Sequence, residues 1–180
     1  MTAPLELLPR QYLDGTCGRI IGLLEEGGAR YRLVPHAPEG RTEVASRLRG
    51  HPPAQAAKCI VARVRLSKRS GRYVLAVVPG DRLVDLDELA RLYGGRDAAF
   101  ADRETAARLS GATCGCIPPF SFAPELTPVV DPALLDHDEI FLSAARLDLS
   151  LAVRTPDYLA LARPETAAIA RPATRIGVSA

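Results

Sequence analysis

Apolar residues recur at the helical period in several stretches of the chain. Between positions 14 and 26, Ile20, Ile21, Leu23 and Leu24 form an apolar stripe, and two glycines follow it. This pattern is typical of an amphipathic helix that ends at a glycine. The same pattern, with a capping residue at each start, predicts further helices at 42–49, 86–94, 103–110 and from Thr155 onward.

Other stretches alternate between apolar and polar residues, as strands do. In the segment 59–66, every second residue from Ile60 to Leu66 is apolar, and the positions between them include Arg63 and Arg65. The segment 72–78 follows a short turn and is the predicted antiparallel partner. Further short strands are predicted at 31–36, 127–130, 139–143 and 149–153. This order of elements predicts the α/β class (mixed α+β), with helices around one central mixed sheet.

Length and composition favour a single domain. The chain has 180 residues, of which 47% are apolar, and this amount of apolar sequence suits one core. No run of 18 apolar residues occurs, and the N-terminal segment lacks the basic start and apolar core of a secretion signal. We therefore expect a soluble, cytoplasmic protein without a membrane segment.

The charge balance argues against a protein that coats nucleic acid by charge alone. Lys and Arg number 23 and Asp and Glu number 21, which gives a net charge of +2. Basic residues nevertheless cluster around one predicted turn: Arg63, Arg65, Lys68, Arg69 and Arg72. Such a cluster is either the solvated face of a hairpin or a surface that neutralises nucleic-acid phosphates.

The sequence GATCGCIPPF, at positions 111–120, combines two cysteines, two glycines and two prolines. A metal site is not expected, because a single residue separates Cys114 from Cys116 and the three histidines are scattered. The spacing also differs from that of thioredoxin-like motifs, and without an export signal we expect no disulfide among the four cysteines. The remaining interpretation is a stiff backbone loop, in which Gly115 permits close approach of a ligand and the prolines fix φ. Such a loop is either purely structural or part of a binding site.

Several motifs follow one another in a definite order: TEVASRL, AAKCIV with Lys58, VVPGD, DLDELARLYG, GCIPPF, PVVD and EIFLSAA. In this order they resemble the YbaK/prolyl-tRNA-editing family, the single-domain deacylases that hydrolyse wrongly charged aminoacyl-tRNA. The same domain occurs as an insert in bacterial prolyl-tRNA synthetases. The most specific parts of the resemblance are Lys58 before an apolar strand and the Gly-x-x-x-Pro-Phe pattern of Gly115 to Phe120.

The resemblance implies a domain organisation. It covers an editing-like domain at 14–163 with a partly barrel-like sheet, and it leaves terminal extensions at 1–13 and 164–180. From Arg163 onward the chain is rich in Pro, Ala and Thr and shows little periodicity, so we expect little regular structure there.

The resemblance also assigns roles to individual residues. Lys58 and Gly115 are the implied catalytic positions: the lysine holds the substrate electrostatically, while loop backbone groups and a terminal hydroxyl of the tRNA orient the attacking water. The implied substrate-binding residues are His36, Thr42, Cys59, Cys116, Ile117, Pro118, Pro119, Phe120, Asp131, Ser143 and Asp148. The Gly-x-Ser-x-Gly elbow of serine hydrolases is absent from the sequence. No cofactor or metal is implied.

Two positions depart from the family pattern. Cys59 stands where a hydroxyl residue is common, and Ser143-Ala144-Ala145 stands where glycine-rich sequence is common. These differences bear on amino-acid specificity more than on the reaction.

The predicted function is trans-editing, the hydrolysis of the ester of a mischarged aminoacyl-tRNA. The expected substrate is tRNA(Pro) carrying a small non-cognate amino acid, and a prolyl-tRNA synthetase is a candidate partner. The basic residues Arg63, Arg65, Lys68 and Arg69 are predicted to contact the acceptor stem. The alternative is a non-catalytic module of the same fold that binds aminoacyl-tRNA or a nucleotide and regulates a partner. A hydrolysis assay distinguishes the enzyme from the non-catalytic module.

Overall fold

The computed structural model describes residues 9–173. Its helices are α1 (Gly15–Glu26), α2 (Thr42–Arg49), α3 (Leu86–Leu92), α4 (Arg103–Ser110), α5 (Pro132–Leu135) and α6 (Thr155–Ala162), with 3-10 turns at Arg10–Tyr12 and Pro53–Gln55. Its strands are β1 (Tyr31–Pro35), β2 (Ala57–Arg65), β3 (Gly71–Pro79), β4 (Arg82–Val84), β5 (Asp97–Phe100), β6 (Leu126–Val130), β7 (Glu139–Ser143), β8 (Leu149–Arg154), β9 (Glu165–Thr166) and β10 (Ala170–Pro172).

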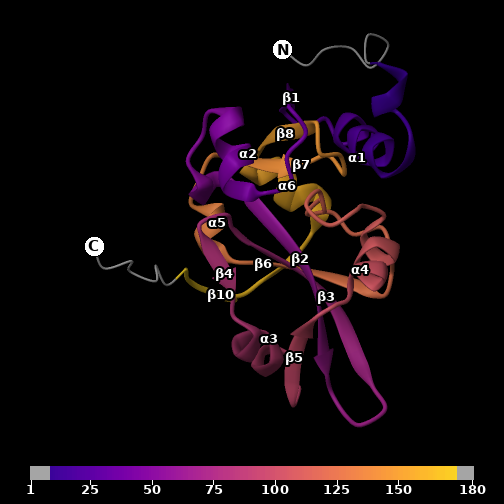
Figure 1. Cartoon of the computed structure of the whole chain (residues 1–180), viewed down its shortest axis with the longest axis vertical. Helices are drawn as coiled ribbons and strands as arrows, with labels where there is room; N and C mark the ends of the chain where they lie inside the picture. Colours follow the sequence, from indigo (N-terminus) through magenta and orange to yellow (C-terminus); the bar gives the residue numbers. More distant parts are fainter. Residues whose placement is uncertain (1–8, 174–180) are drawn as a thin grey trace.

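The largest sheet has five strands in the order β5-β2-β3-β6-β9. β2 pairs antiparallel with β3 and β5, whereas the pairs β3–β6 and β6–β9 are parallel, so the sheet is mixed. In Figure 1 the β2–β3 hairpin crosses the molecule diagonally, from the region of α2 to a turn that projects beyond the other elements. The register places Lys58 opposite Val78 near the α2 end and Arg65 opposite Gly71 near the turn.

Two smaller sheets complete the fold. The antiparallel sheet β1-β8-β7 is connected to the start of β2 by a parallel bridge between Ala56 and Phe141. A two-stranded sheet pairs β4 with β10. The start of β2, the three-stranded sheet and α2 therefore meet at one junction, and the site described below lies there.

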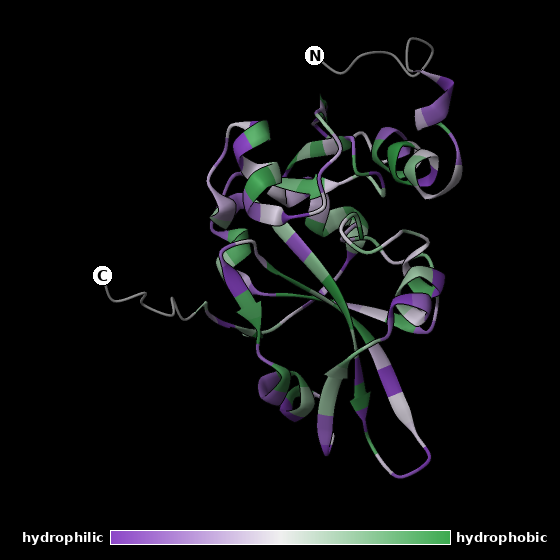
Figure 2. Ribbon diagram, viewed as in Figure 1, coloured by the Kyte–Doolittle hydropathy of each residue, from purple (hydrophilic) through white to green (hydrophobic). Residues whose placement is uncertain are grey.

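The β2–β3 hairpin has a buried core on each face, because its side chains alternate between the two faces. Val61 and Val77 belong to a larger cluster that includes the buried face of α1. Val64 and Val74 belong to a smaller cluster with Leu89 of α3. Figure 2 shows the projecting turn of the hairpin mostly in hydrophilic colours, and the turn contributes to neither core.

The predicted α/β class, with a mixed sheet in one domain, is confirmed. The predicted helices agree with the structure to within two residues, because their ends depend on local signals. Asp85 accepts hydrogen bonds from the N–H groups of Asp87 and Glu88 at the start of α3, and Asp102 accepts one from Thr105 at the start of α4. Both caps were readable from the sequence.

Other predictions about the fold are wrong. The strands form three sheets rather than one central sheet, and the short strands β4 and β5 were not predicted. Part of the tail beyond Arg163, where the sequence predicts little regular structure, forms β9 and β10 and fully buries Ile169. Strands this short show no readable alternation, and their partners, β6 and β4, are distant in sequence. Residues 1–8 and 174–180 of the terminal extensions lie outside the described residues.

Candidate active site

A cavity of about 230 Å³ lies where α2, the start of β2 and the three-stranded sheet meet. Seven residues predicted from the sequence line it: His36, Thr42, Lys58, Cys59, Gly115, Ile117 and Ser143. The lining also includes Glu39, Arg49, Arg146 and Ser150, which sequence reasoning missed. Pockets for drug-sized ligands begin at roughly 300 Å³, so this cavity suits a small group.

Gly115 lies at the rim of the cavity, where two loops touch. Its φ is +97°, in the region that favours glycine. A Cβ atom at this position would lie 3.0 Å from Cα of Gly40, which belongs to the loop between β1 and α2. The backbone conformation and the close contact therefore both require glycine at position 115.

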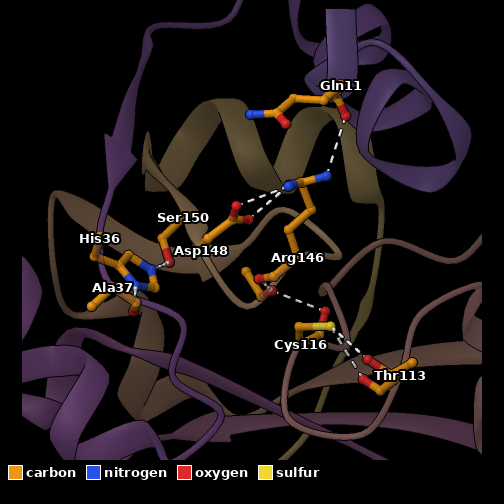
Figure 3. Close-up of polar contacts among 9 residues, drawn as sticks. Gln11, His36, Ala37, Thr113, Cys116, Arg146, Asp148 and Ser150 are labelled. Atoms are coloured by element: carbon orange, nitrogen blue, oxygen red, sulfur yellow. Dashed lines mark hydrogen bonds and ion pairs between the residues drawn. The ribbon is translucent and has the colours of Figure 1, made fainter. Parts of the chain in front are cut away.

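Cys116 fixes the segment that follows Gly115. The residue is buried, and its thiol lies 3.2 Å from the hydroxyl and 3.3 Å from the carbonyl oxygen of Thr113 (Figure 3). Its own carbonyl accepts a hydrogen bond of 2.9 Å from Ser143 Oγ. Cys116 thus holds the loop to β7, and it does not line the cavity, whereas Cys114 is exposed and both thiols are free.

Pro118, Pro119 and Phe120 anchor the same loop in the core. All three are buried, and the Phe120 ring packs edge-on against Tyr158 with 5.7 Å between ring centroids. These three residues do not line the cavity. The part of GCIPPF that faces the cavity is Gly115 and Ile117.

Lys58 lines the cavity from the start of β2. Its ammonium donates hydrogen bonds to the carbonyls of Gly80, at 3.2 Å, and of Arg82, so it is tied to the turn between β3 and β4. Burial lowers the pKa of Lys58, and the nearby carboxylates of Asp81 and Glu43 oppose this change. An ammonium has three N–H donors, so one of them is free to face a ligand. Beside it, burial raises the pKa of the Cys59 thiol, which keeps the thiol neutral.

A chain of hydrogen bonds connects Arg49, Ser150 and His36. Arg49 Nη1 lies 3.3 Å from Ser150 Oγ, which in turn lies 2.8 Å from His36 Nε2. His36 Nδ1 lies 2.8 Å from the carbonyl oxygen of Ala37, as Figure 3 shows. Because a carbonyl only accepts, Nδ1 carries a proton, and Nε2 is the ring nitrogen that faces the Ser150 hydroxyl. Arg49, Ser150 and His36 are thus linked within the lining of the cavity.

Arg49 could have been found from the sequence by helical geometry. Thr42, Ala45 and Arg49 are spaced at i, i+3 and i+7 in α2, so they share one face of the helix, and all three line the cavity. Ser150 carried no comparable signal, because it lies in a strand whose residues are almost all buried.

Asp148 acts on the cavity through Arg146. The Arg146 guanidinium binds both carboxylate oxygens of Asp148, each at 2.8 Å, and a third N–H reaches the carbonyl of Gln11 (Figure 3). The hydrogen bonds from Arg146 lower the pKa of Asp148. Arg146 lines the cavity, whereas the predicted Asp148 orients it from behind.

Asp131 lies outside the cavity. Its carboxylate caps α5 by accepting from the N–H of Ala133 and also accepts from the N–H groups of Ile169 and Ala170. These bonds hold the start of β10 against the end of β6. The structure thus places Asp131 in a structural position, apart from the other predicted substrate-binding residues.

The basic hairpin, defined as Arg63, Arg65, Lys68, Arg69 and Arg72, lies far from the cavity. At about 3.3 Å per strand residue, Arg65 is roughly 23 Å along β2 from Lys58. Arg65 pairs with Asp97, whereas Lys68 and Arg69 are exposed at the turn. The projecting turn seen in Figure 1 thus carries two cations that take part in none of the ion pairs found between residues 9 and 173.

Residues 9–173 contain no group of three or more His, Cys, Asp or Glu side chains arranged to hold a metal ion. Within that range, every helix is too short or too polar to cross a membrane.

The fold and the cavity define a small mixed α/β domain with a partly open site, lined by polar and apolar residues, for a small group. The family model of the aminoacyl-tRNA editing domain matches residues 36–161 of the sequence, which is more than half of the chain. The chain belongs to this family, and its enzyme class is that of the aminoacyl-tRNA deacylases. The family resemblance read from the sequence motifs is thereby confirmed.

Individual relatives agree with this assignment. The multifunctional Ser/Thr-tRNA deacylase ProXp-y of Escherichia coli (strain K12) is 40% identical over 142 residues, which cover 78% of this chain and 84% of that protein. Two solved structures share the fold: a hypothetical protein (TM-score 0.76, 19% identity, covering 85% of this chain and 99% of that one) and a protein described as a candidate trans-editing enzyme for prolyl tRNA synthetase (TM-score 0.72, 23% identity, covering 87% and 97%).

Proposed function

We propose that this chain removes a small amino acid, serine and threonine first among them, from mischarged tRNA. The observation that carries the proposal is the convergence of Lys58 and the Gly115 rim on a polar cavity of about 230 Å³. A cavity of this size suits an aminoacyl group with a short side chain. The relative of 40% identity is named a Ser/Thr-tRNA deacylase, which supports serine and threonine as the cleaved groups.

The cavity lining supports recognition of a hydroxyl-bearing side chain. Three hydroxyl residues, Thr42, Ser143 and Ser150, are part of its lining. A site that hydrogen-bonds a substrate hydroxyl rejects analogues without one more strongly than a purely apolar pocket does. Cys59 and Ile117 supply the apolar part of the lining.

In the proposed reaction, water attacks the carbonyl carbon of the ester that joins the amino acid to the terminal ribose. The free N–H of Lys58 holds the substrate electrostatically, and the backbone of the Gly115 loop positions the ester beside the water. Cys116, Pro118, Pro119, Phe120 and Asp148 contribute by fixing these groups. Asp131 has no part in the proposed site, because its carboxylate is engaged at α5.

A panel of charged tRNAs tests the proposal. We expect the purified chain to release serine and threonine from mischarged tRNA and to act more slowly on phenylalanyl-tRNA, because a phenyl side chain leaves less of the cavity of about 230 Å³ for the ester. The measurement is the initial rate of release of labelled amino acid, with the Lys58→Ala variant as control. Within the panel, tRNA(Pro) charged with a small amino acid is the expected preferred carrier. A wild-type chain that releases no amino acid from any charged tRNA would overturn the proposal.

We further propose that the basic hairpin contacts the acceptor stem. Replacing Arg65, Lys68 and Arg69 together by Ala should raise KM about tenfold and lower the slope of log KM against log salt by roughly two, since two unpaired cations are lost. The value of kcat should change little. The control is Arg91→Ala with Arg163→Ala, which removes two exposed cations elsewhere. An unchanged salt slope in the triple variant would make the hairpin an ordinary solvated turn.

Partner and location follow the same proposal. A prolyl-tRNA synthetase is the candidate partner, and one structural neighbour is described as a candidate trans-editing enzyme for such a synthetase. The cytoplasm is the proposed location, since charged tRNA is the substrate.

A further inference from the structure

Arg49 is a half-buried cation in the cavity, and no acidic partner for it exists among the described residues. It is the last residue of α2; its Nε donates to the carbonyl of Ala45 at 2.9 Å and its Nη1 to Ser150 Oγ at 3.3 Å. None of the ion pairs between residues 9 and 173 includes it. A guanidinium has five N–H donors, so three remain available to a ligand.

We propose that Arg49 binds the carbonyl oxygen of the aminoacyl ester and stabilises the oxyanion that forms on it during hydrolysis. This inference rests on the proposed function, because it assigns a further catalytic residue to the same reaction. It gives Arg49 a task different from that of Lys58.

The surroundings of Arg49 hold the guanidinium in place. The Ala45 carbonyl accepts from Nε, and Ser150 Oγ accepts from Nη1 and is itself hydrogen-bonded to His36 Nε2. The carbonyl of Ala37 in turn holds the His36 ring through Nδ1. The unused donors of Arg49 are therefore preorganised, which is the property that oxyanion stabilisation requires.

Arg49 and Lys58, the two cations of the lining that belong to no ion pair among the described residues, differ in their free donors. Lys58 uses two of its three N–H groups on the carbonyls of Gly80 and Arg82, whereas Arg49 keeps three of five. Burial lowers the pKa of Arg49 to about 10, so the side chain remains charged at neutral pH. A half-buried charge without a counterion is costly, and a transition state that carries negative charge offsets this cost more than a neutral ester does.

The charges of the cavity also select which substrate atom faces Arg49. The substrate ends in an α-ammonium group, which Arg49 repels. Glu39 is the one carboxylate among the described residues that line the cavity, and hydrogen bonds from Arg41 hold the pKa of this carboxyl at about 2. An ester with its ammonium toward Glu39 directs its carbonyl oxygen away from that wall. The carbonyl oxygen is also the acceptor that every aminoacyl ester has, whatever its side chain.

The reaction step is balanced without any further reactant. The oxygen of water bonds to the carbonyl carbon, and the carbonyl electron pair moves onto the oxygen that Arg49 holds. When this pair returns, the bond to the ribose oxygen breaks, and one proton of the water passes to that ribose oxygen. The other proton stays with the carboxyl product, which then ionises.

The test compares Arg49→Gln and Arg49→Lys with the wild-type chain. The substrate is seryl-tRNA, and the binding probe is an amide-linked seryl-tRNA analogue that cannot be hydrolysed. We expect Arg49→Gln to lower the single-turnover rate at saturating enzyme roughly thirtyfold, since glutamine keeps a donor but loses the charge. Its Kd for the amide analogue should change less than about threefold, because the oxyanion exists only in the transition state. Arg49→Lys should fall between Arg49→Gln and wild type.

The matched control is Arg47→Ala, two residues earlier on α2 and exposed, which should leave the rate unchanged. If Arg49→Gln and Arg49→Lys both retain the wild-type rate, the role of Arg49 is overturned, whereas the proposed function stands. Loss of affinity for the amide analogue at an unchanged single-turnover rate would also overturn it, because Arg49 would then bind the substrate uniformly. A wild-type chain without activity on any charged tRNA would overturn the proposed function together with this role. Thermal unfolding of each variant checks its fold, and Arg49→Lys serves if Arg49→Gln is unstable.

Discussion

Replacing Gly115 by valine is expected to reduce deacylation on the order of a thousandfold. The backbone at this position has φ +97°, which a β-branched residue adopts only with strain, and a Cβ would lie 3.0 Å from Cα of Gly40. The two loops must therefore separate, and a displacement of about 1 Å at a reacting group can lower a rate a hundredfold. The measurement is the single-turnover rate of seryl-tRNA hydrolysis, with thermal unfolding to confirm the fold.

The neighbouring cysteines provide the matched control. The double variant Cys114→Ser with Cys116→Ser should retain activity within about threefold, because a serine hydroxyl can replace the contacts of the Cys116 thiol with Thr113. The backbone of the loop is unchanged in this variant. If the double serine variant is inactive and lacks a metal that the wild-type chain binds, the cysteine sulfurs and not the loop backbone are the functional part of GCIPP.

Lys58→Ala is expected to leave the fold intact and to lower deacylation on the order of a hundredfold, as for the loss of one preorganised electrostatic contact. The lysine is the cation of the cavity that lies on β2, and its removal also frees the carbonyls of Gly80 and Arg82. Those carbonyls lie at a turn where water can replace the ammonium, so the fold should tolerate the substitution. The loss of activity should appear mainly in kcat/KM, because Lys58 is proposed to hold the substrate.

Two further variants separate charge from packing at this position. Lys58→Met keeps the aliphatic stem and removes the charge, so it should resemble Lys58→Ala. Arg91→Ala removes an exposed cation on α3 and should leave the rate unchanged. Near-normal turnover by folded Lys58→Ala and Lys58→Met proteins would remove Lys58 from the mechanism.

The stability of the site depends on contacts between distant parts of the chain. His36 and Ser150 are 114 positions apart, and Ser143 and Cys116 are 27 apart, yet each pair is joined by a side-chain hydrogen bond. The loop that contains Gly115 is held between these connections and the buried Phe120. A substitution in β8 can therefore alter the rim of the cavity without touching the substrate.

The sequence by itself determined what depends on neighbours along the chain. The stripe of Ile20, Ile21 and Leu24 places α1, and the side chains of Asp85 and Asp102 start α3 and α4. Periodicity and capping act over one or two helical turns, so they can be read without knowing the path of the chain. The order of the motifs was also sufficient for the family and hence for the reaction class.

The tertiary structure alone decided which side chains meet. It joined Arg49 to Ser150, directed Asp131 to the N–H groups of Ile169 and Ala170, and paired β9 and β10 with strands far back in the chain. Such contacts depend on where the sheets bring distant segments together, and no local pattern of apolar and polar residues encodes that position. An arginine at the end of an amphipathic helix is usually solvated. Helical spacing puts Arg49, unlike Arg47, on the face of α2 that carries Thr42 and Ala45, but its burial beside Ser150 is decided by the tertiary structure. The physical reason is that helices and caps are stabilised by residues close in sequence, whereas a cavity exists only once the sheets have packed.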